Sequence, residues 1–85
     1  MVALVTHAVH ARELAGETTT LRQLHQVTNI SQATALRVVY DLEDAGAFEI
    51  EPDEWDRFAS RIALTKTMRD EMERASRAIL KQQSA

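Results

Sequence analysis

The side chains best suited to specific chemistry lie near the middle of the chain. They are Ser31, Gln32, Ala33, Thr34 and Arg37. Glutamine can form two hydrogen bonds with adenine, arginine can do the same with guanine, and threonine or alanine can contact a thymine methyl group. Ser31 adds a hydroxyl that can cap a helix or reach a phosphate. These residues predict contacts with duplex DNA, and the alternative is an ordinary solvent-exposed helix face.

Residues 20–46 have the pattern needed to present those side chains. Thr20, with a glutamine three residues later, matches a capping box and predicts a helix that begins at the next residue. Asn29 tolerates the left-handed backbone of a tight turn, Ser31 is suited to cap the next helix, and Gly46 is a plausible stop. A helix, a turn and a second helix in this order are typical of a helix-turn-helix, whose second helix enters the major groove.

Apolar residues at helical spacing predict which sides of these helices face inward. The expected inner set is Leu21, Leu24, Val27, Ile30, Ala35, Val38, Val39 and Leu42. His25 is expected to be exposed. An earlier stripe of apolar residues predicts a further helix from Val2 to Ala15, before Gly16.

A wing over about 47–64 is predicted next. Apolar and polar residues alternate on either side of a polar, turn-prone segment, which favours two antiparallel strands. We expect Arg57 and Arg61 either to contact the DNA backbone or minor groove, or to neutralise the acidic residues that precede them. Trp55, between the strands, is either a wing-tip residue available to a partner or a ring that folds back on its own hairpin, and we expect the second.

A last helix is predicted over about 66–82, capped by Thr65. Its apolar stripe consists of Met68, Met72, Ala75 and Ile79. A monomer of this size has little left to cover that stripe and the stripe on the first helix, so we expect a homodimer joined through the terminal helices.

Length and composition limit the remaining possibilities. A chain of 85 residues suits one small domain over 1–85, of the α+β class and mainly α. The net charge is −3, and residues 41–56 hold eight acidic residues and no base, which weighs against a strongly basic DNA-binding surface. No signal peptide or membrane-spanning pattern is evident, so a cytoplasmic location is expected.

No catalytic or metal site is predicted. The absence of cysteine excludes thiolate ligands, and no nucleophile–base pair or phosphate-binding loop stands in a recognisable context. His7 and His10 are three residues apart, which permits a shared metal, but the helix offers no convincing further ligand. We therefore expect no enzyme activity, no metal and no cofactor.

From Thr20 onward the sequence resembles the MarR-type winged-helix transcriptional regulators, in a shortened form. The resemblance rests on Ser31, Thr34 and Arg37 spaced by threes, on Leu42-Glu43 and Gly46, and on Asp53-Glu54-Trp55-Asp56-Arg57 followed by Leu64-Thr65. It implies a winged helix-turn-helix with a three-helix core, a two- to three-stranded antiparallel wing and a C-terminal helix. It also implies sequence-specific binding to double-stranded DNA.

The sequence departs from the family pattern at two positions. Phe58 stands where the family usually has a second wing arginine, and Met68 stands where it usually has a glycine. The family also builds its dimer from additional helices, and this chain is too short to hold the full set. The missing wing arginine and the net acidity support an alternative, a winged-helix protein–protein interaction module or a regulatory subunit without DNA binding. A small-molecule effector is left open.

Overall fold

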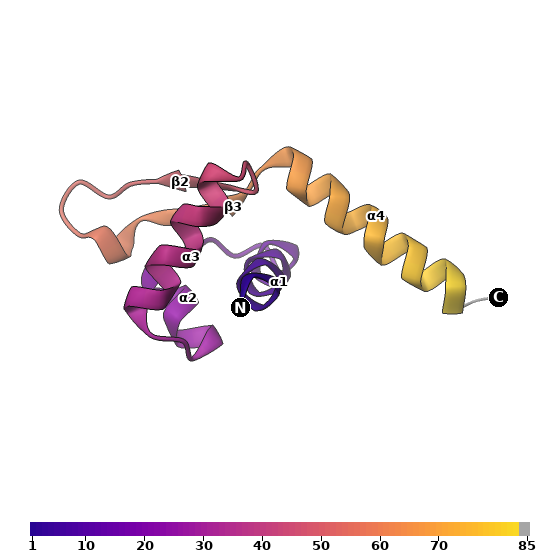
Figure 1. Ribbon diagram of the computed structural model, residues 1–85, viewed down its shortest axis with the longest axis horizontal. Helices are drawn as coiled ribbons and strands as arrows, with labels where there is room; N and C mark the ends of the chain where they lie inside the picture. Colours follow the sequence, from indigo (N-terminus) through magenta and orange to yellow (C-terminus); the bar gives the residue numbers. More distant parts are fainter. Residues whose placement is uncertain (84–85) are drawn as a thin grey trace.

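The computed structural model describes residues 1–83, which form four α-helices, three short strands and one 3-10 turn (Figure 1). The elements in chain order are α1 (Val2–Leu14), β1 (Thr19–Thr20), α2 (Leu21–Thr28), α3 (Gln32–Asp44), β2 (Phe48–Glu51), η1 (Arg57–Ala59), β3 (Arg61–Leu64) and α4 (Lys66–Gln83). The predicted winged helix-turn-helix of the α+β class, mainly α, is confirmed. Among the described residues, no helix combines the length and apolar character needed to span a membrane.

The ends of α2 and α3 are set by local hydrogen bonds. Thr20 Oγ1 accepts from Gln23 N at 3.2 Å, and Gln23 Oε1 accepts from Thr20 N at 2.9 Å, which completes the predicted capping box. Asn29 follows α2 in the left-handed conformation, with φ of 58°. Ser31 Oγ then caps α3 by accepting from Thr34 N at 3.1 Å. These predicted caps and the predicted turn are confirmed.

The wing is part of a three-stranded antiparallel sheet with the order β1-β3-β2. Phe48 lies opposite Leu64 and Ile50 opposite Ile62, so apolar residues of β2 and β3 share one face. The short strand β1 pairs with the other edge of β3, where Thr19 lies opposite Ile62. The threonines before α2 thus join the helix-turn-helix directly to the wing.

The hydrophobic core lies where α1, α2, α3 and the sheet meet. Its buried members are Val5, Val9, Leu21, Leu24, Ala35, Val38, Val39, Leu42, Phe48, Ile62, Leu64 and Met72. All four inner residues predicted for α3 are buried, and Ile30 is partly buried against the core.

The inner face of α2 was predicted wrongly at one position. Val27 is 52% exposed, whereas Leu21 and Leu24 are buried. At 3.6 residues per turn, the buried side of α2 is centred near Thr28, and Val27 lies roughly 100° away from it. His25, expected to be exposed, is partly buried because it faces the turn into α3.

The last helix, α4, leaves the rest of the molecule and gives it an elongated shape of 50 × 24 × 23 Å (Figure 1). Thr65 Oγ1 accepts from Met68 N at 3.2 Å, as predicted for the cap, and donates to Gly46 O at 2.8 Å. Met72 is buried against the core, but Ile79 is 55% exposed. Only the beginning of the predicted α4 stripe is therefore covered by its own chain.

A polar junction fixes the direction in which α4 leaves. Glu13 Oε1 accepts from Leu64 N at 3.1 Å, and Glu13 Oε2 accepts from Arg69 Nε at the same distance. Arg69 also donates to Leu64 O at 3.1 Å. The hydrogen bond and the charge of the Glu13 carboxylate raise the pKa of Arg69, which favours the charged guanidinium. The end of α1, the end of β3 and the first turn of α4 are thereby held together.

Candidate DNA-binding surface

The first turns of α3 carry exposed side chains that make no hydrogen bond or ion pair with the rest of the described residues. Gln32, Ala33 and Arg37 are exposed, and neither Gln32 nor Arg37 has a hydrogen-bond or ion-pair partner among the described residues. Arginine and glutamine side chains on one exposed helix face are free to bind base edges or phosphates.

Two of the predicted contact residues are engaged in the cap of α3. Ser31 Oγ donates to Thr34 Oγ1 at 2.8 Å and accepts from Thr34 N at 3.1 Å. Their hydroxyls therefore hold the start of the helix. A phosphate contact by either residue would be additional to this structural role.

Tyr40 is a surface residue that the sequence reasoning overlooked. It is 43% exposed and follows Arg37 by three positions, which places both on the same side of α3. The signal was available as an aromatic residue in helical register with Ala33 and Arg37. Beyond Tyr40 the helix ends in the exposed acids Asp41, Glu43 and Asp44, which would repel phosphates. The usable part of α3 is thus its first half and middle.

The turn between α2 and α3 is closed by His25 as well as by the backbone. Nδ1 of His25 donates to the Ile30 carbonyl, and the His25 carbonyl accepts from Asn29 N at 3.0 Å. The first contact spans the left-handed residue Asn29, and the second is made by its own amide. They set the angle at which α3 departs from α2.

The two wing arginines have different surroundings. Arg61 NH2 lies 3.2 Å from Glu51 Oε1 on the neighbouring strand, and both side chains are exposed. Arg57 is exposed and has no ion-pair partner among the residues that the structure describes. Neutralisation of the acidic segment thus applies to Arg61, whereas Arg57 remains available for a phosphate.

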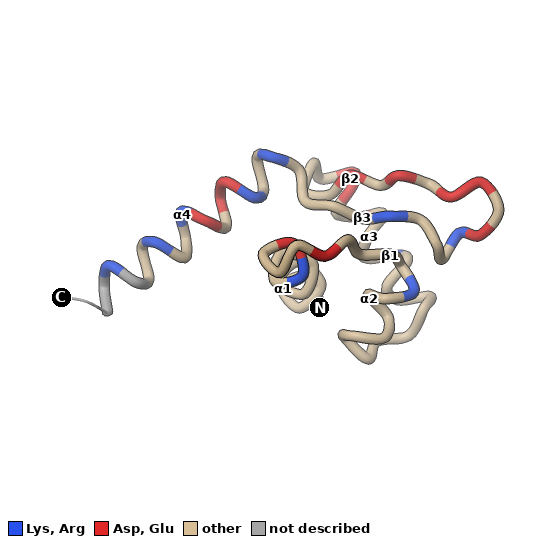
Figure 2. Tube along the Cα trace, turned by 180° about the vertical axis from the view of Figure 1, so that it is seen from behind, with Lys and Arg blue, Asp and Glu red and all other residues tan. Residues whose placement is uncertain are grey.

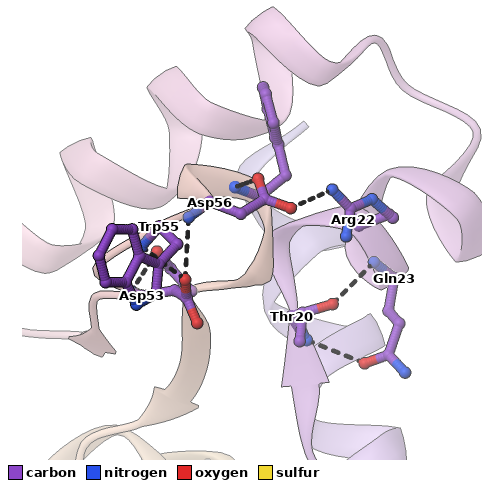
Figure 3. Close-up of polar contacts among 8 residues, drawn as sticks. Thr20, Arg22, Gln23, Asp53, Trp55 and Asp56 are labelled. Carbon is purple, nitrogen blue, oxygen red and sulfur yellow. Dashed lines mark hydrogen bonds and ion pairs between the residues drawn. The ribbon is translucent and has the colours of Figure 1, made fainter.

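The loop of the wing is tied to α2 by an ion pair (Figure 3). Arg22 NH2 lies 2.6 Å from Asp56 Oδ2, while Asp56 Oδ1 accepts from Phe58 N at 3.0 Å. The hydrogen bond from Arg22, followed by the one from the Phe58 amide, lowers the pKa of Asp56. The aspartate therefore fixes both the start of η1 and the position of the wing beside α2.

The two aromatic residues near the wing loop differ in burial: Phe58 faces the core, whereas Trp55 faces solvent. Phe58 is partly buried and packs against the core, so no cation occupies the position of the usual wing arginine. Trp55 is 89% exposed, and the prediction that its ring folds back is wrong. Asp53 Oδ1 accepts from Trp55 N and Asp56 N, both at 2.9 Å, and this tight turn leaves the indole outside the core (Figure 3).

Acidic residues follow one another closely along β2 and the loop after it, and others lie on α1 and α4 (Figure 2). Basic residues are spread over η1, β3 and α4 in the same view, whereas α3 contributes only Arg37. The acidic strand and loop are separate from α3, whose own acidic residues lie at its C-terminal end.

An open cavity of about 520 Å³ lies between the end of α1 and the wing. Its lining includes Glu13, Glu17, Glu49 and Glu51, with Ile50 and Ile62 among the apolar contributors. Within the described residues, no group of three His, Cys, Asp or Glu side chains is placed to hold a metal ion. His7 is exposed and His10 is partly buried, on the first helix.

Solved structures with the same fold were found. The heme sensor protein PefR from Streptococcus agalactiae, in complex with heme, superposes with a TM-score of 0.75 at 18% identity, over 95% of this chain and 56% of that one. A MarR family transcriptional regulator from Silicibacter pomeroyi superposes with a TM-score of 0.71 at 19% identity, over 98% of this chain and 53% of that one. The adhesin competence repressor AdcR from Streptococcus pyogenes superposes with a TM-score of 0.62 at 18% identity, over 95% of this chain and 60% of that one.

These similarities establish the fold. The chain has the winged-helix fold of MarR family transcriptional regulators and spans between about half and three-fifths of the length of the three proteins. No protein-family model matches the sequence, and no curated protein matches it either.

Proposed function

We propose that this protein binds duplex DNA sequence-specifically to regulate transcription, and that it does so as a homodimer. The observation that carries the proposal is the exposed face of α3, where Gln32 and Arg37 have no partner of their own and the capped helix start holds them in place. The fold shared with a MarR family transcriptional regulator supports it.

The helix-turn-helix gives the proposed surface a defined geometry. Closure of the turn by His25 and Asn29 fixes α3 against α2, and the Arg22–Asp56 pair fixes the wing beside them. With α3 in a major groove, the wing reaches the flanking backbone, where Arg57 supplies a phosphate contact. Arg61, already paired with Glu51, makes the weaker contribution.

Dimerisation would compensate for the small number of basic residues that one subunit has available for phosphate contacts. Exposed apolar side chains remain on both terminal helices, among them Leu4 and Leu14 on α1 and Ile79 on α4. Their burial between two subunits would bring two recognition helices to one face of the DNA. Half-sites about 34 Å apart would then be read together, doubling the phosphate contacts of an acidic chain.

The proposal is tested by selecting bound duplexes from a random library with the purified protein. Enrichment of a pseudo-palindromic sequence, with affinity that falls as salt is raised, is the expected result. Failure to enrich any sequence, together with no binding to random duplex at low salt, would contradict DNA binding. Enrichment of a single half-site would retain DNA binding but contradict the dimer.

A further inference from the structure

We propose that the tip of the wing is a docking site for a basic peptide segment, with Trp55 as its aromatic anchor. The wing tip is defined here as Asp53, Glu54 and Trp55. This inference goes beyond DNA binding, because the wing tip includes neither the exposed face of α3 nor Arg57, the wing residue proposed to contact a phosphate.

The first observation is the exposure of Trp55. Its ring is the largest side chain in the protein, yet 89% of its surface is exposed, and its indole N–H has no hydrogen-bond partner among the described residues. Phe58, three residues later, packs against the core. An exposed tryptophan with an unused N–H is typical of interfaces, where indole supplies both apolar area and a hydrogen-bond donor.

The second observation is the sign of the charge around the ring. Glu54 is exposed and has no ion-pair partner among the described residues, and Asp53 uses only Oδ1 in the turn. Acidic residues continue along β2 before the tip (Figure 2), where Glu49 is exposed and Glu51 is paired with Arg61. Lysine or arginine can bind carboxylates and stack on an indole face at once, so this combination selects a cationic segment.

The same charges disfavour nucleic acid as the occupant. Two carboxylates next to Trp55 in the sequence repel phosphates, and both wing arginines, Arg57 and Arg61, lie after the tip. The tight turn held by Asp53 keeps the ring presented to solvent, with both loop amides already satisfied. A basic protein segment therefore complements the tip in charge and in shape.

The experiment uses the full chain and a fluorescently labelled octalysine peptide as the probe. Binding is followed by anisotropy of the label, and the location by the emission of Trp55, the only tryptophan in the chain. Trp55→Ala leaves the net charge unchanged and should weaken binding about threefold to tenfold, whereas Trp55→Tyr should recover most of it. Glu54→Lys should weaken binding, while Glu43→Lys at the end of α3 serves as the matched charge control.

Binding that shifts the Trp55 emission and follows this order of variants is the expected result. Equal affinity of the wild type and Trp55→Ala, or equal losses for Glu54→Lys and Glu43→Lys, would overturn the proposal and leave only general attraction to an acidic protein. The same measurements are repeated with random duplex DNA in place of the peptide. If DNA shifts the Trp55 emission and Trp55→Ala weakens DNA binding, the tip is a DNA contact and the proposal is wrong.

Discussion

Arg22 at the start of α2 and Asp56 in the wing loop form an ion pair at 2.6 Å, although they are 34 residues apart in the sequence. This contact joins the helix-turn-helix to the wing. Because Asp56 also caps η1, the side chain that positions the wing loop is the same one that anchors it to α2.

The Arg22–Asp56 pair should make stability depend on pH. The folded pKa of Asp56 is lowered, so its contribution is present above the ordinary aspartate pKa of about 3.9 and is lost as the pH falls below it. Arg22→Met should therefore lower the thermal midpoint at pH 7, with a smaller difference near pH 3. Arg74→Met on α4 is the control. A difference of the same size at both pH values would show that Arg22 acts through packing alone.

Arg37 should contribute directly to base recognition. Arg37→Ala is expected to cost about 1–3 kcal/mol of binding to a preferred duplex and to relax the preference at one base position. Its thermal midpoint should match the wild type because the side chain is exposed and unpaired. Affinity is measured by titration of the selected duplex, and unchanged affinity and base preference would remove Arg37 from the contact surface.

Arg57 and Arg61 should differ in their effect on the salt dependence of DNA binding. Loss of one phosphate contact lowers the slope of log K against log salt by about 1. Arg57→Ala should show this decrease, whereas Arg61→Ala should change it less because Glu51 already neutralises Arg61. The reverse order would mean that the Glu51–Arg61 pair opens on DNA.

Leu24 and Val27 provide a matched test of the core on one helix. Leu24 is fully buried and Val27 is 52% exposed, although they are only three residues apart. Leu24→Ala should cost about 2–5 kcal/mol of unfolding free energy, and Val27→Ala well under that. Chemical denaturation measures both. Similar losses of unfolding free energy for the two variants would show that the buried face of α2 has been assigned incorrectly.

Ile79 tests the proposed dimer without disturbing the core. Ile79→Glu places a charge on an exposed apolar position of α4, and it should convert a sedimenting dimer into a monomer at unchanged thermal stability of the winged core. Met72→Glu would be less informative because Met72 is buried in its own chain. Arg74→Glu is the control for added negative charge. A wild type that sediments as a monomer at tens of micromolar would contradict the dimer.

What could be predicted from the sequence depended on the range of the interaction. The capping box of Thr20 and Gln23 and the cap at Ser31 act over three residues, so the sequence pattern contains both partners. The wing strands and the buried set of α3 followed from periodicity. The DNA contacts assigned to Gln32 and Arg37 remain predictions that their exposure supports.

The exposure of Val27 and the role of His25 were not predicted, and of the two alternatives for Trp55 the wrong one was preferred. Each is decided by tertiary placement. The core lies on the Thr28 side of α2, which turns Val27 outward, and the turn brings His25 to the Ile30 carbonyl. Trp55 is exposed because Phe58, and not the indole, occupies the apolar site beneath the wing.

The junction at Glu13 has a consequence for the order of events during synthesis. Glu13 belongs to the first helix, but its hydrogen-bond donors are encoded 51 and 56 residues later, at Leu64 and Arg69. An emerging chain can form the local caps of α2 and α3 at once, since both partners are made together. The carboxylate of Glu13 has neither donor until Leu64 is made, and it gains its ion-pair partner only with Arg69. The attachment of α4 to the end of α1 can therefore be completed only late in synthesis, after the local caps of α2 and α3 are in place.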